Sequence, residues 1–208
     1  MTDDALKRKV LHVGCGSKSL RHLPAPFHDG TWAEIRLDID PSCRPDIIGT
    51  IVDMEGVATG SVDAVYSSHN IEHVFPHEVP VALGEFARVL TADGFALITC
   101  PDLQSLGEAI AAGRVEDPVY TSRMGPIAPL DILYGHRGSV ARGQHHMAHR
   151  CGFTQETLAK ALRAAGFASV GVRPKREGSI NLWAVAMKGA VGKDRLRRML
   201  DEYSHHSR

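Results

Sequence analysis

The residues best suited to chemistry near the start of the chain are two glycines and an aspartate. Gly14, Cys15 and Gly16 directly follow the apolar run Val10–Val13. Because the two glycines lack a Cβ, they let the backbone approach a ligand closely. Asp38 follows the next apolar run, 22 residues after Gly16 (38 − 16), where one carboxylate can accept both hydroxyls of a ribose.

A third position in the same order extends this pattern. Asp53 can accept a hydrogen bond from the exocyclic amine of an adenine, and the apolar Met54 beside it can cover the ring. Each of these positions alone is equally typical of a solvated turn. Their order and spacing together favour a nucleoside-binding site.

Such a site needs a sheet that brings the ends of several strands together. Residues 10–13, 33–37, 62–66 and 95–100 are short apolar runs that stop at polar loops, as buried parallel strands do. Between the last two runs, residues 78–90 place apolar side chains at intervals of four, three and four, which predicts an amphipathic helix. We therefore expect an α/β fold with a doubly wound, mostly parallel Rossmann-like sheet and helices on both faces.

The second half of the chain predicts further helices and a closing antiparallel hairpin. Thr154 is a good N-cap for one of these helices, and Gly166 ends it. The expected elements are helices over 103–112 and 154–166, strands over 168–172 and 182–187, and a basic C-terminal helix with a tail over 192–208. We expect residues 1–208 to form a single domain, with 103–150 as an insertion or lid on the substrate side.

Four segments in this order resemble the class I S-adenosylmethionine-dependent methyltransferases, in particular the bacterial type 11 group. They are Lys9–Gly16 (KVLHVGCG), Arg36–Pro41 (RLDIDP), Ser61–Val74 (SVDAVYSSHNIEHV) and Glu85–Pro101 (EFARVLTADGFALITCP). The resemblance covers roughly residues 9–102. It implies an enzyme that transfers a methyl group from S-adenosylmethionine to a small acceptor.

The resemblance also implies which residues bind the cofactor. The glycine loop would approach the methionine part, the acid after the second strand would hold the ribose, and the next acid would frame the adenine. The end of the strand 62–66 would lie near the sulfonium and the acceptor. The implied cofactor-binding residues are Gly14, Cys15, Gly16, Asp38, Ile39, Asp53, Met54, Ser68 and His69.

Two positions depart from the family pattern. His12 stands where the family usually has an acid, and Lys18 stands where it usually has a third glycine. The first change predicts weaker bonding to the amino end of the cofactor, and the second adds positive charge near a sulfonium. Both favour an alternative, a non-catalytic binding module with this fold. A nicotinamide-dependent oxidoreductase is disfavoured because Ser19 stands where a GxGxxG loop has its last glycine.

Histidines are the candidate general bases. A sulfonium methyl group is already activated, so a base need only remove a proton from an oxygen or nitrogen of the acceptor. His69 and His73 are the catalytic candidates, and His136 and His145 are further ones.

The same histidines raise the question of a metal. His69, His73 and His77 are spaced by four and share a face if the segment is helical. We expect no metal site, because Glu72 is off that face and Pro76 interrupts the helix. Family members also commonly keep a histidine at the position of His73 without a metal.

The insertion is locally basic. Residues 134–150 contain arginines and histidines but no acid, and they follow the strand 95–100. Methyltransferases of this class often carry substrate-specific insertions there, so the segment is a candidate lid for an anionic acceptor. A solvated loop or a contact in a homodimer explains the composition equally well. The residues predicted to bind the acceptor are His136, Arg137, His145 and His149.

Composition argues against several other classes of protein. Lys+Arg and Asp+Glu are 24 each, so no net charge attracts the chain to nucleic acid or anionic membranes. No apolar run approaches the roughly 18 residues of a membrane helix. The four cysteines lie far apart and form no CxxC pair, which disfavours a disulfide framework. The acidic start lacks the pattern of a signal peptide, so we expect a cytoplasmic protein without nucleic-acid or membrane partners.

Overall fold

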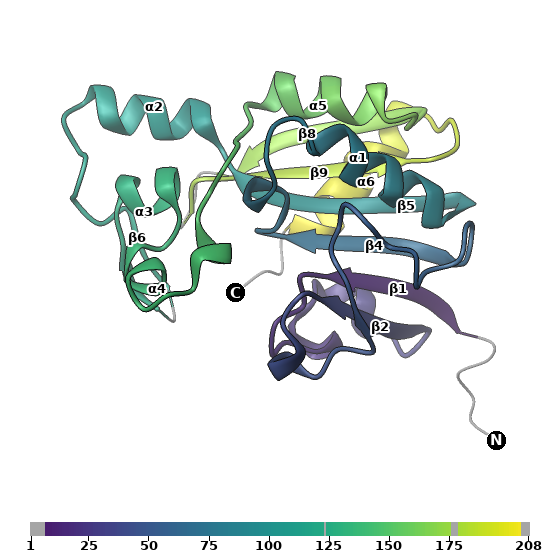
Figure 1. The fold of residues 1–208 in the computed structure, drawn as a ribbon. Coiled ribbons are helices and arrows are strands. Elements are labelled where there is room, and N and C mark those ends of the chain that lie inside the picture. Colours follow the sequence, from purple (N-terminus) through teal and green to yellow (C-terminus); the bar gives the residue numbers. More distant parts are fainter. Residues whose placement is uncertain (1–6, 123, 176–178, 205–208) are drawn as a thin grey trace.

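The computed structural model describes residues 7–122, 124–175 and 179–204, whose arrangement Figure 1 shows. The strands of its main sheet are β1 (Arg8–Val13), β2 (Trp32–Asp38), β3 (Ile47–Ile48), β4 (Val62–Ser68), β5 (Leu90–Pro101), β8 (Ser169–Lys175) and β9 (Asn181–Met187). They form a seven-stranded sheet in the order β3-β2-β1-β4-β5-β9-β8. The first five strands in this order are parallel to one another, and β9 runs antiparallel to both of its neighbours, β5 and β8. The expected doubly wound sheet with a closing hairpin is confirmed.

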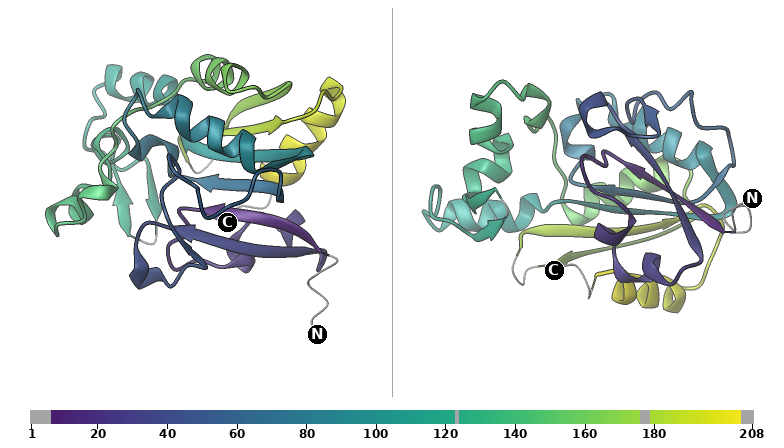
Figure 2. Two further views of the ribbon diagram at one scale, coloured as in Figure 1. Left: turned by 45° about the vertical axis from the view of Figure 1, so that its right-hand side comes forward. Right: turned by 90° about the horizontal axis from the view of Figure 1, so that it is seen from below.

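Helices cover both faces of this sheet. On one face lie α1 (Val79–Val89) and α5 (Gln155–Ala164), as Figures 1 and 2 show. On the other lie α6 (Lys193–Ser204) and two 3-10 turns, η2 (Leu20–His22) and η3 (Ala25–His28). The expected coverage is therefore confirmed, although one face relies on 3-10 turns in place of a helix between β1 and β2.

Two hydrophobic cores follow from the alternation of side chains along each strand. Leu11 and Val13 of β1 pack with α1 and α5 in one core, whereas Val10 packs with α6 in the other. The second core is rich in aromatic rings, with Phe27 completely buried among Trp32, Tyr66, Phe95 and Tyr203. The sheet thus packs between two apolar layers, and the loops at the carboxyl ends of its strands lie outside both layers.

The strand β5 is longer than the sequence predicted. The sequence predicted a strand over 95–100, but Asp93 and Gly94 also lie within a continuous strand from Leu90 to Pro101. Pairing with β4 is irregular there: Val62 lies opposite Leu90 whereas Ala64 lies opposite Phe95, so the intervening residues bulge. Pro101 also remains in the strand, paired with Asn181 of the antiparallel neighbour.

The insertion forms a group of short elements beside the carboxyl end of β5, at the left of Figure 1. They are α2 (Leu103–Ala111), β6 (Tyr120–Ser122), β7 (Gly125–Ile127), α3 (Pro129–Tyr134), α4 (Arg137–Ala141) and a 3-10 turn η6 (His145–Met147). Leu106, Ile127 and Ile132 give this group a small apolar cluster of its own. Its role as a lid stays a prediction.

Some expectations fall at the ends of the chain. The predicted C-terminal helix is α6, which is described as far as Ser204. Residues 205–208 of the predicted tail and the acidic start 1–6 lie outside the described residues. Over the described ranges, every helix is too short or too polar to cross a membrane.

We predict that Phe27→Ala lowers the free energy of unfolding by about 3–5 kcal/mol, because it empties the centre of the aromatic core. The measurement is urea denaturation followed by circular dichroism. Phe75→Ala is the matched control, because that ring is 46% exposed and its loss should cost less than about 1 kcal/mol. Equal losses in the two variants would contradict the central role of Phe27.

Candidate functional site

The loop after β1 turns sharply at its two glycines. Gly14 and Gly16 have φ angles of +61° and +53°, in the left-handed region that other residues rarely adopt. A Cβ on Gly14 would lie 2.7 Å from the side chain of Asn70, which comes from the end of β4. Cys15 between them is buried, and burial raises the pKa of its thiol to about 11. The loop therefore offers exposed backbone and a neutral thiol, which is no nucleophile near neutral pH.

Asp38 at the end of β2 is bonded directly to this loop. Its Oδ2 accepts a hydrogen bond of 2.7 Å from the backbone N–H of Gly16, and its Oδ1 accepts one of 2.9 Å from that of Asp40. Each carboxylate oxygen has a second lone pair, so both can still accept from a ligand. The predicted partners, the glycine loop and Asp38, are thus brought together.

Two further side chains of β2 hold the chain that follows β1. Arg36 donates to the carbonyl oxygens of Gly16 (2.6 Å) and Cys43 (3.0 Å). Glu34 lies on the same face of β2: its Oε1 is 2.8 Å from Nδ1 of His12, and its Oε2 accepts from the N–H of Leu20 at 2.6 Å. His12, which departs from the family pattern, therefore has a partner in this structure: its ring forms a buried pair with Glu34.

The predicted adenine position is only partly as expected. Asp53 is exposed, but the side chain of Met54 is 1% exposed and packs in the main core. The expectation that Met54 covers a ring is therefore wrong. Its backbone N–H is fixed by Glu85 (2.9 Å), which turns the side chain of Met54 into the core. Ile39, 60% exposed and next to Asp38, is the apolar side chain that is free to cover a ligand.

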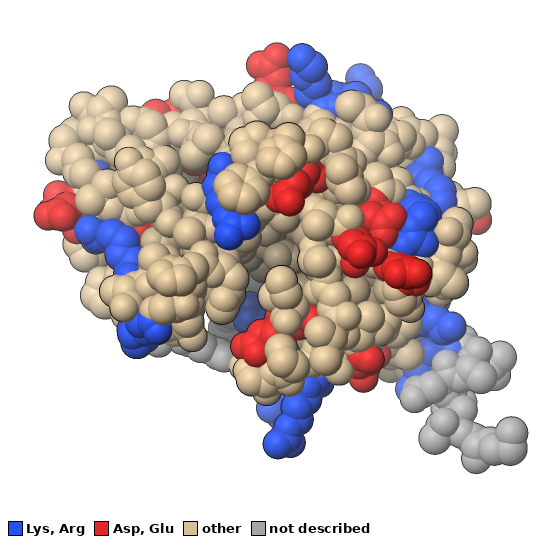
Figure 3. Space-filling view, viewed as in Figure 1, with Lys and Arg blue, Asp and Glu red and all other residues tan. Residues whose placement is uncertain are grey.

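An open groove of about 600 Å³ lies beside this position. It runs between the loop carrying Asp53 and the helix α1, where Figure 3 shows acidic and basic side chains gathered. Glu85 and Arg88 in its wall are bonded to each other at 2.6 Å. The groove is lined by Val52, Asp53, Glu55, Pro80, Val81, Gly84, Glu85 and Arg88. Only Asp53 belongs to the predicted cofactor site, so the groove borders that site and does not contain it.

The end of β4 brings together a histidine and a buried acid. Ser68 accepts a hydrogen bond from Thr99 Oγ1 (3.0 Å), and His69 follows with a φ angle of +51°. The side chain of His69 is 40% exposed, and its Nδ1 lies 3.2 Å from Oε1 of Glu72, which is almost fully buried. Burial raises the pKa of Glu72, but its hydrogen bond to His69 and the nearby charges of His69, His73 and His149 bring the net pKa below its usual value. Glu72 is thus a carboxylate held behind an accessible imidazole.

The histidines 69, 73 and 77 do not share a helical face. The chain makes only one 3-10 turn there, η5 (Ile71–His73). His77 lies on the surface with its ring stacked on Phe75, 5.7 Å between centroids. The sequence therefore missed Glu72 and Asn70 as site residues, because a helical assumption placed Glu72 away from the histidines. Their position just after the expected strand 62–66 was the available signal.

The four residues predicted to bind the acceptor are dispersed. His136 accepts from the backbone N–H of Ser139 (3.2 Å) and begins α4. Arg137 is paired with Asp131 at 3.0 Å and Glu116 at 3.5 Å, so its charge is already matched. His145 is exposed to solvent. Of the four, only His149 contacts a predicted catalytic residue: its ring centroid is 4.9 Å from that of His73.

Comparison with known proteins agrees with this geometry. A family model described as a methyltransferase domain matches residues 11–98, which span β1 to β5 and include the glycine loop, Asp38 and His69. These residues are similar to the type 11 methyltransferase domain family. The resemblance noted from the sequence is confirmed over this segment. No protein of curated function matches the sequence.

Solved structures share the fold of this chain. One is a Burkholderia thailandensis 1,6-didemethyltoxoflavin-N1-methyltransferase with bound 1,6-didemethyltoxoflavin and S-adenosylhomocysteine, with 18% identity, a TM-score of 0.54, and coverage of 89% of this chain and 73% of that one. A second is a SAM-dependent methyltransferase from Methanosarcina mazei, with 15% identity, a TM-score of 0.59, and coverage of 89% and 94%. A third, from Archaeoglobus fulgidus, has 15% identity, a TM-score of 0.53, and coverage of 88% and 86%. At these identities the likeness concerns the fold alone.

We predict that Gly14→Ala destabilises the protein by about 1–3 kcal/mol, because a Cβ there combines a left-handed backbone with a clash against Asn70. Urea denaturation measures the loss. In the Gly14→Ala background, Asn70→Ala should recover part of the loss by removing the clash.

The matched control is Gly107→Ala, in the helix α2, where a Cβ meets nothing within 4 Å. It should stabilise the protein by about 0.5–1 kcal/mol. An equal response to alanine at positions 14 and 107 would rule out the strained geometry.

Proposed function

We propose that this protein transfers the methyl group of S-adenosylmethionine to a small acceptor. The observation that carries the proposal is the hydrogen bond between Asp38 and the backbone N–H of Gly16. It joins the carboxyl ends of two adjacent parallel strands, where doubly wound sheets bind the ribose and the neighbouring groups of a nucleoside. A carboxylate already fixed at that place needs no rearrangement to receive ribose hydroxyls.

The surrounding residues fit this cofactor. Nδ2 of Asn70 is buried beside Gly14 and has no hydrogen-bond partner, so it would donate to the carboxylate of the methionine part. Asp38 would hold the ribose hydroxyls, and the exposed Ile39 would cover the adenine in place of Met54. Asp53 would accept from the adenine amine. An unpaired buried amide is costly, and a bound carboxylate would remove that cost.

His69 is the residue we assign as general base. When bound, S-adenosylmethionine supplies an electrophilic methyl group on its sulfonium, so alignment of the acceptor contributes most of the rate. Nδ1 of His69 faces the Glu72 carboxylate and must therefore carry the proton, which leaves Nε2 free to take one from the acceptor. Glu72 would orient the ring and stabilise the imidazolium that forms.

The insertion would exclude water and contribute charge. Backbone N–H groups of Arg150 and Cys151 donate to the carbonyl oxygen of Glu72, so the end of the insertion lies against the turn after β4. Arg150 would attract an anionic acceptor in place of Arg137. Its guanidinium lies 4.5 Å from the centre of the Phe75 ring, and within the described ranges it forms no ion pair.

For the cofactor, Asp38→Ala is expected to weaken S-adenosylmethionine binding by about 1.5–3 kcal/mol, the range for hydrogen bonds to a charged group. Isothermal titration calorimetry measures the affinity. Asp40→Ala removes a neighbouring carboxylate that caps η4 and should change the affinity by less than about 0.5 kcal/mol. NAD should give no binding heat with the wild-type protein. Unchanged affinity in Asp38→Ala would remove the ribose assignment.

For catalysis, His69→Ala should lower kcat by about 10²–10⁴-fold, the usual contribution of a general base, while the affinity for S-adenosylmethionine stays within about twofold. The assay follows S-adenosylhomocysteine formation with fractionated small-metabolite extracts as acceptor source. His77→Ala, a surface histidine nearby, should leave the rate unchanged. If S-adenosylmethionine binds but no fraction yields product even with wild type, the protein is a binding module and not an enzyme.

A further inference from the structure

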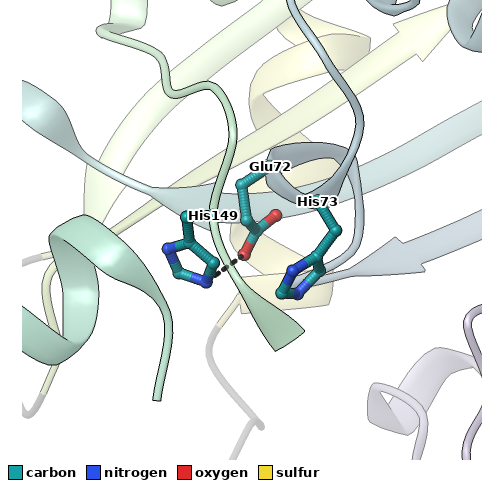
Figure 4. A group of neighbouring side chains, drawn as sticks. All are labelled: Glu72, His73 and His149. Atoms are coloured by element: carbon teal, nitrogen blue, oxygen red, sulfur yellow. Dashed lines mark ion pairs between the residues drawn. The ribbon is translucent and has the colours of Figure 1, made fainter. Parts of the chain in front are cut away.

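Glu72, His73 and His149 form a compact cluster that the proposed reaction does not use as a unit. One potential ligand atom from each of the three lies within 4.8 Å of the others. Figure 4 shows the two imidazole rings on either side of the Glu72 carboxylate. Glu72 and His73 belong to the turn η5 after β4, whereas His149 lies near the end of the insertion, 76 positions later (149 − 73).

Both rings are oriented by backbone carbonyl groups. Nδ1 of His149 lies 2.7 Å from the carbonyl oxygen of Ile132, and Nδ1 of His73 lies 3.1 Å from that of Ala148. Because a carbonyl oxygen only accepts, each Nδ1 must carry a hydrogen. In a neutral ring the Nε2 atom then presents a lone pair. Metal-binding histidines are held in the same way, through a hydrogen bond from the other ring nitrogen.

Oε1 of Glu72 accepts from Nδ1 of His69 at 3.2 Å, but its other near neighbour, His149, offers it no proton. Oε1 of Glu72 lies 3.9 Å from Nε2 of His149, so two acceptors face each other. Oε2 is buried and has no hydrogen-bond partner, and the side chain is 1% exposed. A buried carboxylate oxygen without a partner is costly, and a cation between the carboxylate and the two Nε2 atoms would remove that cost.

We propose that Glu72, His73 and His149 bind a divalent transition-metal ion of the Zn²⁺ type. Two imidazole nitrogens and one carboxylate oxygen suit Zn²⁺ and similar ions, whereas Mg²⁺ and Ca²⁺ prefer oxygen ligands alone. Ligands of a tetrahedral Zn²⁺ lie about 3.4 Å apart, so small side-chain rotations would close the cluster around the ion. Three protein ligands leave a position for water or for an oxygen of a ligand.

Such an ion would join the end of the insertion to the end of β4. Backbone N–H groups of Arg150 and Cys151 already donate to the carbonyl oxygen of Glu72, at 2.8 and 3.2 Å. The ion would add bonds through side chains at the same junction. We expected no metal because spacing within one segment was the only signal for a ligand set. His149 and the turn η5 are far apart in the sequence, so spacing does not pair them.

The test uses the full chain, first stripped of metal with a chelator, and Zn²⁺ alone as the probe. Isothermal titration calorimetry should show one equivalent bound per chain. Co²⁺ in place of Zn²⁺ should give the intense visible absorption of a four- or five-coordinate site. Glu72→Gln, His73→Ala and His149→Ala should each weaken binding by more than about 100-fold, which exceeds the loss typical of outer-shell partners.

His77→Ala and His145→Ala are matched controls, because both side chains are exposed histidines outside the cluster. They should bind Zn²⁺ as the wild type does, and circular dichroism establishes which variants are folded. Absence of stoichiometric binding by the wild-type protein would overturn the proposal, as would binding that survives in folded His149→Ala. The S-adenosylmethionine titration on metal-free protein is a separate measurement, so the metal site and the methyl-transfer function can fail independently.

Discussion

The placement of the glycine loop depends on one polar face of β2. Glu34, Arg36 and Asp38 alternate along the strand, so all three side chains point to the same side. Each bonds a different part of the chain after β1: Asp38 and Arg36 hold the N–H and the carbonyl of Gly16, and Glu34 holds the N–H of Leu20. A doubly wound unit normally fixes this loop with a helix. Here only 3-10 turns follow β1, so side-chain hydrogen bonds from the neighbouring strand supply the rigidity.

The same constraint explains the histidine at position 12. His12 is 1% exposed, and its Nδ1 lies 2.8 Å from the Glu34 carboxylate. An acid at position 12, as the family usually has, would put two carboxylates in contact in a buried place, where like charges repel strongly. The change at His12 and the use of Glu34 to hold Leu20 therefore belong together. His12 is thus held by Glu34, the same side chain that fixes the N–H of Leu20.

The sequence predicted the elements with strong periodicity and missed the contacts between distant segments. The apolar runs ending at Gly14 and Ser67 became β1 and β4 because burial on both faces of a parallel sheet leaves a continuous apolar pattern. No local signal shows that Met54 faces the core or that Arg137 is matched by Asp131. Both outcomes depend on tertiary packing, which residue type and spacing do not contain.

Glu72 contacts both the residues that follow β4 and the end of the insertion. Its Oε1 lies 3.2 Å from His69 on the methyl-transfer side and 3.9 Å from His149 on the insertion side. Its backbone carbonyl accepts the N–H groups of Arg150 and Cys151. Any movement of the insertion must therefore move the groups around one buried carboxylate. The insertion is thus linked to the proposed base through contacts of a single residue, Glu72.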